Sequence, residues 1–142
     1  MEAASALSVP AFEMLASFFD LAYAYRFGPP GHHVTSICLT EAVTGAVLAE
    51  AFHFPVGRAM PREHLGLMVA PIEQDGRWYL DVSTERFAQS VQIVAEVGRP
   101  MDNWFHLRPS SRRRIELVDL GEGRPSGDVC AINGREMLAY SV

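Results

Sequence analysis

The stretch RWYLDVSTERFAQSVQIVAEV, residues 77–97, decides the fold of this chain. Trp78, Leu80 and Val82 occupy alternate positions in its first part. In its second part the alternate positions belong to Val91, Ile93, Ala95 and Val97. Alternate side chains of an extended strand face opposite sides. The pattern therefore predicts two strands, each with one buried face.

Similar short segments flank this stretch on both sides. A turn signal, Asp75-Gly76, precedes it, and further signals recur about every ten residues. Short alternating strands at this spacing are typical of an antiparallel β-sandwich. The other segments expected to be strands are LGLMVAPIEQ (65–74), WFHL (104–107), RRRIELV (112–118) and DVCAIN (128–133).

The first third of the chain has a different pattern. Residues 34–54 predict a β-hairpin with its turn at Thr44-Gly45, and LAYAYRF (21–27) alternates like a strand. AFEMLASFFD (11–20) fits a helical turn or an irregular apolar segment equally well. Because PVGRAMPRE (55–63) contains two prolines and a glycine, we place a boundary there, between domains 1–57 and 58–142.

Composition excludes several classes of protein. The 142 residues are 49% hydrophobic and 20% charged, which fits a globular domain rather than a disordered tail, a coiled coil or a fibre. The chain is also too short to contain a complete (β/α)₈ barrel, which alone needs about 250 residues. The net charge of −5 argues against nucleic acid as a partner. We expect the one basic run, Arg112-Arg113-Arg114, to be a solvated strand face or a charged edge.

The two cysteines, Cys38 and Cys130, lie in apolar alternating stretches without metal-ligand spacing. We expect free thiols and a cytoplasmic location, with a disulfide as the alternative. Residues 1–25 lack a basic segment followed by a continuous apolar one. This pattern predicts neither a signal peptide nor a membrane span.

Motifs for catalysis or metal binding are not evident in the sequence. The five histidines have no metal-ligand spacing, the serines have no GxSxG elbow, and LGEGRPSG (120–127) is no phosphate loop. None of the 17 acidic residues belongs to a recognisable catalytic motif. We therefore expect no catalytic, metal-binding or cofactor-binding residue.

Trp104 and Trp78 are the candidates for contact with a sugar. Trp104 follows Asp102-Asn103 and precedes Phe105, so it is able to stack on a sugar ring. The competing interpretation, which we favour, is a turn at Asp102-Asn103 followed by two core residues.

Three stretches of the second segment together resemble the C-terminal Ig-like domain of β-mannosidases of glycoside hydrolase family two. They are RFAQSVQIVAEV (86–97), MDNWFHLRPSSRRRIELV (101–118) and SGDVCAINGRE (126–136). The residues that match the family's Asp-Asn-aromatic-Phe element and its following turn are Asp102, Asn103, Trp104, Phe105, Leu107 and Pro109. FFDLAYAYRFGPPGHHV (18–34) and TGAVLAEAFHFPVGR (44–58) look like the end of the preceding Ig-like domain.

The resemblance implies an all-β chain: an immunoglobulin-like antiparallel β-sandwich preceded by part of a second one. It also implies a fragment of a longer enzyme, because the family's catalytic barrel is not in this sequence. The expected function is a non-catalytic accessory domain of an enzyme that hydrolyses terminal β-D-mannosyl residues, with the other domains of that enzyme as partners. A carbohydrate-binding module and an independent Ig-like interaction domain remain alternatives.

A half-sandwich at residues 1–57 leaves strand edges and an apolar face uncovered. Tyr23, Phe27, Leu48 and Phe52 belong to that face. We therefore expect some self-association through the N-terminal half.

Overall fold

The computed structural model describes residues 9–15, 19–20, 24, 28 and 31–142. The chain divides into two compact units, residues 1–59 and 60–142. The break falls within the segment 55–63, two residues after the boundary expected from its prolines and glycine. Each unit is described by itself below.

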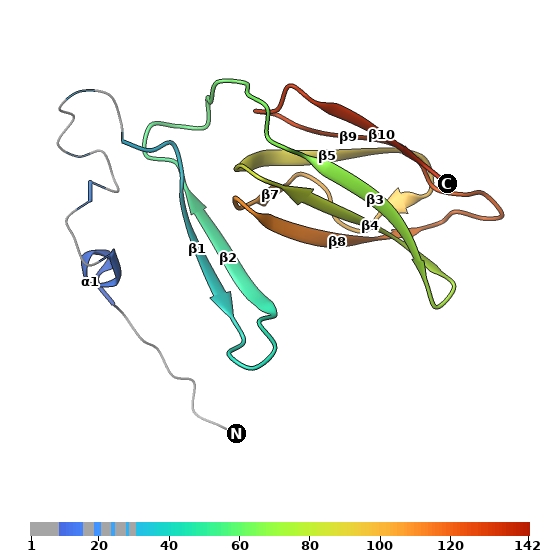
Figure 1. Ribbon diagram of the computed structural model, residues 1–142, viewed down its shortest axis with the longest axis horizontal. Helices are drawn as coiled ribbons and strands as arrows, with labels where there is room; N and C mark the ends of the chain where they lie inside the picture. Colours follow the sequence, from blue (N-terminus) through green and yellow to red (C-terminus); the bar gives the residue numbers. More distant parts are fainter. Residues whose placement is uncertain (1–8, 16–18, 21–23, 25–27, 29–30) are drawn as a thin grey trace. The chain divides into compact units, whose positions relative to one another are not determined.

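The first unit contains a short helix and a β-hairpin. Helix α1 spans Ala11–Leu15, which settles the choice between a helical turn and an irregular segment there. Strands β1 (Thr35–Thr40) and β2 (Val47–His53) pair in antiparallel register, with Ile37 opposite Ala51. The turn at residues 41–46 is closed by hydrogen bonds between Glu41 and Ala46 and between Gly45 and Glu41. The hairpin predicted from the sequence is thus confirmed (Figure 1).

Two other expectations for this unit concern the strand at residues 21–27 and an uncovered apolar face. Except for Ala24, the strand expected at residues 21–27 lies outside the described residues. Tyr23 and Phe27 of the expected apolar face therefore also lie outside them. Of the apolar face that was expected to be uncovered, Leu48 is 63% exposed and Phe52 is half-buried.

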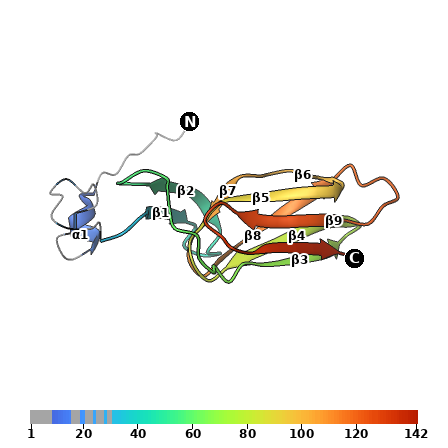
Figure 2. The same ribbon diagram turned by 90° about the horizontal axis from the view of Figure 1, so that it is seen from above.

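The second unit is a sandwich of two four-stranded antiparallel sheets (Figures 1 and 2). One sheet has the order β3-β4-β8-β6 and the other the order β10-β9-β5-β7. The strands of the first sheet are β3 (Met68–Gln74), β4 (Arg77–Thr84), β8 (Ser111–Val118) and β6 (Arg99–Pro100). Those of the second are β10 (Met137–Ser141), β9 (Ser126–Ala131), β5 (Ala88–Val97) and β7 (Phe105–Leu107).

This order matches the immunoglobulin arrangement, in which strands A, B, E and D form one sheet and C, F and G the other. Here β3, β4, β8 and β6 take the first set of positions, while β5, β9 and β10 take the second. Strand β7 adds a short neighbour at the free edge of β5. The predicted all-β, Ig-like sandwich is therefore confirmed for the second unit.

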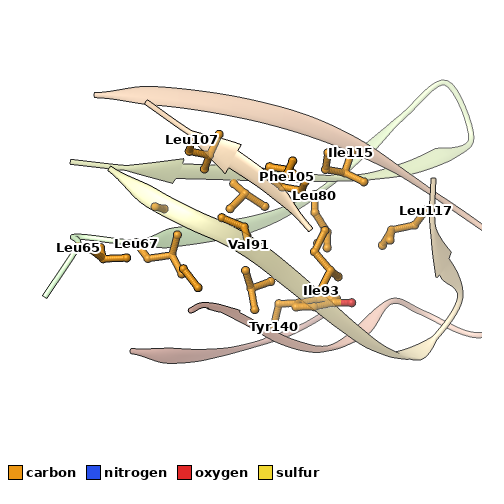
Figure 3. Packing of buried hydrophobic residues seen from close by; sticks show 14 residues of the cluster. Leu65, Leu67, Leu80, Val91, Ile93, Phe105, Leu107, Ile115, Leu117 and Tyr140 are labelled. Atoms are coloured by element: carbon orange, nitrogen blue, oxygen red, sulfur yellow. The ribbon is translucent and has the colours of Figure 1, made fainter. Parts of the chain in front are cut away.

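The core lies between the two sheets and is built from the alternate residues of each strand (Figure 3). Leu80 and Val82 of β4 and Val91 of β5 are fully buried, as their alternation predicts. Leu65 is also fully buried, although it precedes β3. Because each fully buried aliphatic side chain contributes about 1.5–3 kcal/mol, this layer is the main source of stability for the unit.

The segment leading into β3 is fixed to the sandwich rather than free. The backbone of Glu63 pairs with residues 133 and 135, and it forms an isolated parallel bridge with Gly134. The Leu65 amide donates to the carboxylate of Glu136, and the Leu65 carbonyl accepts from the backbone of residues 85 and 86. The second unit therefore begins several residues before its first strand.

The structure corrects two details of the sequence-based prediction. Strands β6 and β10 were not expected; β6 is only two residues long, and β10 has apolar residues on both faces. Trp104 was expected to supply core, but its side chain is 54% exposed. Its φ of 63° breaks the extended conformation, so β7 begins only at Phe105, which is buried.

Candidate functional site

The Asp102–Phe105 corner is the candidate site, because it carries both the exposed Trp104 and the motif singled out in the sequence. A positive φ is uncommon for a residue with a side chain and unfavourable for a bulky one. The corner holds Trp104 in this conformation through its backbone amide. That amide donates to the Val91 carbonyl at 2.8 Å and to Oδ1 of Asn103 at 3.0 Å.

Asn103 acts as a substitute for a strand neighbour. Its Oδ1 accepts a hydrogen bond from the Ile93 amide, and its Nδ2 donates to the Ile93 carbonyl, both at 2.8 Å. The side chain thereby satisfies both backbone groups of one residue on β5, as a paired strand would. Oδ1 of Asp102 in turn accepts from the Asn103 amide at 2.8 Å.

Asp102 also connects the corner to the other sheet. Its Oδ2 lies 2.5 Å from Nη2 of Arg113 on β8. The Arg113 guanidinium lies over the ring of Phe105, 4.9 Å from its centroid. Since Asn103 binds β5 and Arg113 belongs to β8, the corner joins the two layers of the sandwich.

The two candidate tryptophans do not form one platform. Trp78 is on β4, opposite Leu117, and it is half-buried against the core. Trp104 borders β5, in the other sheet. Of the pair, only Trp104 offers most of its side chain to a ligand.

Sequence reasoning missed a second side-chain clamp on the same strand. Asn133 is 1% exposed; its Oδ1 accepts from the Gln89 amide at 2.7 Å and its Nδ2 donates to the Phe87 carbonyl at 2.8 Å. Nδ1 of His106 accepts from the amide of Ser90, at a bulge where φ is 48°. The only signal in the sequence was the turn-forming dipeptide Asn133-Gly134, which gives the turn but not the clamp.

The ionisable groups with shifted pKa values have structural partners. Arg114 forms two hydrogen bonds with Asp81, at 2.7 and 2.9 Å, and lowers the pKa of that carboxyl. Burial opposes ionisation of Glu136, but the backbone amides of residues 136, 65 and 66, with His64, outweigh it and lower its pKa. Both shifts are explained by contacts that hold the sandwich together.

Burial raises the pKa of Tyr140, and the charges of Asp128 and Glu96 add to the effect. Its hydroxyl is buried and has no hydrogen-bond partner among the described residues. It lies close to Gly127, where an added Cβ would be 2.9 Å from the oxygen. Tyr140 is therefore a core residue whose oxygen fits over a glycine.

One groove of about 590 Å³ runs beside β3 and β10. It is mostly apolar, and its polar lining consists of Asp81, Ser83 and Arg112. Asp81 is its only acid and is already engaged by Arg114. A glycosidase of the usual kind needs two carboxylates beside the bond that it cleaves, so this groove lacks that pair.

The histidines and cysteines are dispersed. Within the described part of the chain, no three His, Cys, Asp or Glu residues are grouped so that they could hold a metal ion. His64 contacts Glu136, and His32 contacts Thr35. Cys38 and Cys130 are both free and half-buried. No helix in the described ranges has the length and apolar character needed to cross a bilayer.

Comparison of the chain with protein-family models, with curated proteins and with solved structures gives no match.

Proposed function

We propose that this chain is a non-catalytic accessory β-sandwich of a β-mannosidase-like glycoside hydrolase, in which it stabilises the enzyme and packs against its other domains. The observation that supports this proposal is the corner at Asp102–Phe105. The residues that carry the family resemblance form one connected unit: Asn103 binds β5, and Asp102 binds Arg113 on β8. A structural role accounts for each of these contacts.

The proposal predicts that the purified chain does not hydrolyse mannosides. A retaining mechanism needs an acid and a nucleophile, and the proposal assigns both to a barrel outside this chain. The test is an assay of the chain with 4-nitrophenyl β-D-mannopyranoside and mannobiose. A rate above that of buffer, removed by substitution of a single acidic residue, would overturn the proposal.

A second experiment tests the link to the larger enzyme. The experiment is to sequence the region of the transcript that lies upstream of the part encoding this chain. The proposal expects an in-frame (β/α)₈ barrel that carries two glutamates. An upstream frame that encodes an unrelated protein would favour the independent Ig-like interaction domain instead.

The exposure of Trp104 supports a sugar-binding surface as the second candidate function. The backbone of Trp104 is already held, and its side chain has only two rotatable bonds, so little conformational freedom is lost when a ligand stacks on it. The test is a titration with mannobiose and short manno-oligosaccharides, followed by ¹H–¹⁵N amide shifts. Saturable shifts around Trp104 that disappear in Trp104→Ala, and persist in Trp78→Phe, would establish it. No shifts at millimolar sugar would exclude it.

The proposed partners include a second copy of the chain, bound through the N-terminal hairpin. Ile37 and Leu39 of β1 are 61% and 60% exposed and share one face with the alanines of β2. A two-stranded hairpin is marginally stable alone, so a covered face would stabilise it. Sedimentation equilibrium should show weak association that Leu39→Glu reduces. An unchanged association constant in this variant would contradict the hairpin as the contact.

A further inference from the structure

The outer face of the sheet β10-β9-β5-β7, opposite its core side, is more apolar than a solvated strand face. The register places Met137, Cys130 and Gln92 in one row across the strands, and Ala139, Asp128 and Val94 in the next. Directly opposed residues in an antiparallel sheet have their side chains on the same face. The contact of 3.9 Å between Cys130 and Gln92 agrees with this placement.

Large apolar side chains are exposed on and beside these rows. Met137 is 68% exposed, Val94 47%, and Ile132, at the end of β9, 50%. Trp104 borders the same sheet at β5. Single exposed apolar residues are ordinary, but a contiguous group of them across neighbouring strands marks an interaction surface.

The charges of this sheet are separated toward its two ends. Asp128 and Glu96 lie toward the end where β9 begins, whereas Arg135 is exposed in the β9–β10 turn at the other end (Figure 2). Arg135 uses Nε to donate to the Arg62 carbonyl. None of these three charged groups forms an ion pair with another described residue.

The outer face of the other sheet provides a contrast. There two pairs of opposite charges join adjacent strands: Arg114 is paired with Asp81, and Arg77 with Glu116. Self-contained pairs of this kind suit a face that remains in water. A partner that supplies the opposite sign at each end would complement the unpaired charges of the β10-β9-β5-β7 sheet.

We propose that this face binds the same face of a second copy, forming an isologous dimer around a two-fold axis near Cys130. The two-fold rotation turns one copy end to end, so that Arg135 of each lies opposite the Asp128 and Glu96 end of the other. The apolar rows meet in the middle. A parallel arrangement would bring acids together, and a partner of uniform charge would be repelled at one end.

The size of the face predicts a weak dimer. Four strands at about 4.8 Å spacing and roughly six residues at about 3.4 Å each give a patch about 20 Å on a side. Interfaces of this size belong to the low end of the range for specific association. The dimer should therefore dissociate on dilution, and its charge pairing should make it weaker in high salt.

The test is sedimentation equilibrium of the full chain over a concentration series, at low and high salt. Arg135→Glu and Asp128→Arg should each weaken association by at least about fivefold, because each variant replaces two symmetry-related exposed pairs with like charges. The double variant recreates the pair with its signs exchanged and should restore the association constant. In a Leu39→Glu background, where the hairpin contact is weakened, Val94→Glu should abolish the remaining association.

Two matched controls and a second acid make the result decisive. Met68→Glu alters a methionine of β3, in the other sheet, that is 56% exposed, and Arg112→Glu reverses an exposed charge on β8 of that sheet; neither should change association. If Asp128→Arg lowers the melting temperature, the same test is made with Glu96→Arg, because Glu96 is more exposed than Asp128.

This inference stands apart from the glycosidase proposal and from the hairpin contact. A chain that is monomeric throughout, or a dimer that Leu39→Glu removes and the face variants leave intact, would overturn it.

Discussion

Two asparagine side chains take the place of missing strand neighbours along β5. Asn103 satisfies both backbone groups of Ile93, and Asn133 satisfies the Gln89 amide and the Phe87 carbonyl. A buried backbone group without a partner costs about 1–3 kcal/mol. These two residues therefore stabilise the sheet in a way that neither hydrophobicity nor strand propensity describes.

Asn103→Ala should lower the free energy of unfolding by about 2–3 kcal/mol, because it leaves two backbone groups of Ile93 unsatisfied. Chemical denaturation of the variant and of the wild type measures this loss. Asn103→Asp keeps the acceptor but cannot donate to the Ile93 carbonyl, so it should be destabilised as well. Gln92→Ala is the control, with a change below about 0.5 kcal/mol. Equal stability of Asn103→Ala and the control would show that the clamp is dispensable.

Glu136 makes the stability of the second unit depend on pH. Its folded-state pKa is lowered from the ordinary value of 4.5, so the folded state binds this proton more weakly than the unfolded state. The resulting stabilisation is present above pH 4.5 and is lost as the pH falls through the lowered pKa. Glu136→Gln should cost about 1 kcal/mol at neutral pH and flatten the acid side of the stability curve.

Denaturation of Glu136→Gln at a series of pH values checks this expectation. Glu122→Gln, at an exposed loop position, is the control and should keep the wild-type profile. An acid limb that is equally steep in Glu136→Gln and the wild type would assign the pH dependence to other carboxyls.

At the scale of elements, the alternation of apolar residues was sufficient for the long strands. Leu80, Val82, Val91 and Ile93 are buried as their period of two indicates. The alternation was insufficient to predict β6 and β10. The two residues of β6 are too few to show a period, and β10 carries the exposed apolar residue Met137 on its outer face. The alternation also misplaced Trp104, because a positive φ at one residue redirects a side chain without a trace in the hydrophobic pattern.

Gly127 shows why part of the fold was beyond sequence reasoning. In the sequence it belongs to a glycine-rich loop that predicts little. In the fold its φ is 153°, and an added Cβ would lie 2.2 Å from the Val94 carbonyl oxygen. The residue is a glycine because β5 and Tyr140 approach its backbone closely, which is a property of the sheet and not of the loop.

Gly127→Ala should therefore separate β9 from β5 and destabilise the second unit by more than about 2 kcal/mol, as expected when a side chain is forced into a packed site. Thermal unfolding followed by circular dichroism measures the loss. Gly76→Ala, in the same unit, has a positive φ but open space around it, so it should cost only about 1 kcal/mol. Similar melting temperatures for the two variants would contradict a steric role for Gly127.

At the scale of the whole molecule, the two units differ in how they are held together. The second unit has a buried core drawn from both sheets, whereas the described residues of the first expose Ile37, Leu39 and Leu48. Glu63 and Leu65 tie the start of the second unit to its own sheet, so the junction ends before residue 63. Cleavage should therefore occur more readily before this tie than after it.

Limited trypsin digestion tests this division, because the chain has arginine but no lysine as a site of cleavage. Arg58 is exposed and precedes the tied segment, so cleavage after it should be early. The expected product is residues 59–142, in which Arg113 and Arg114 should resist cleavage because they lie within a paired strand. Mass spectrometry identifies the fragment, and Arg58→Gln should delay its appearance. Early cleavage between residues 77 and 114 would instead mean that the sandwich opens before the junction does.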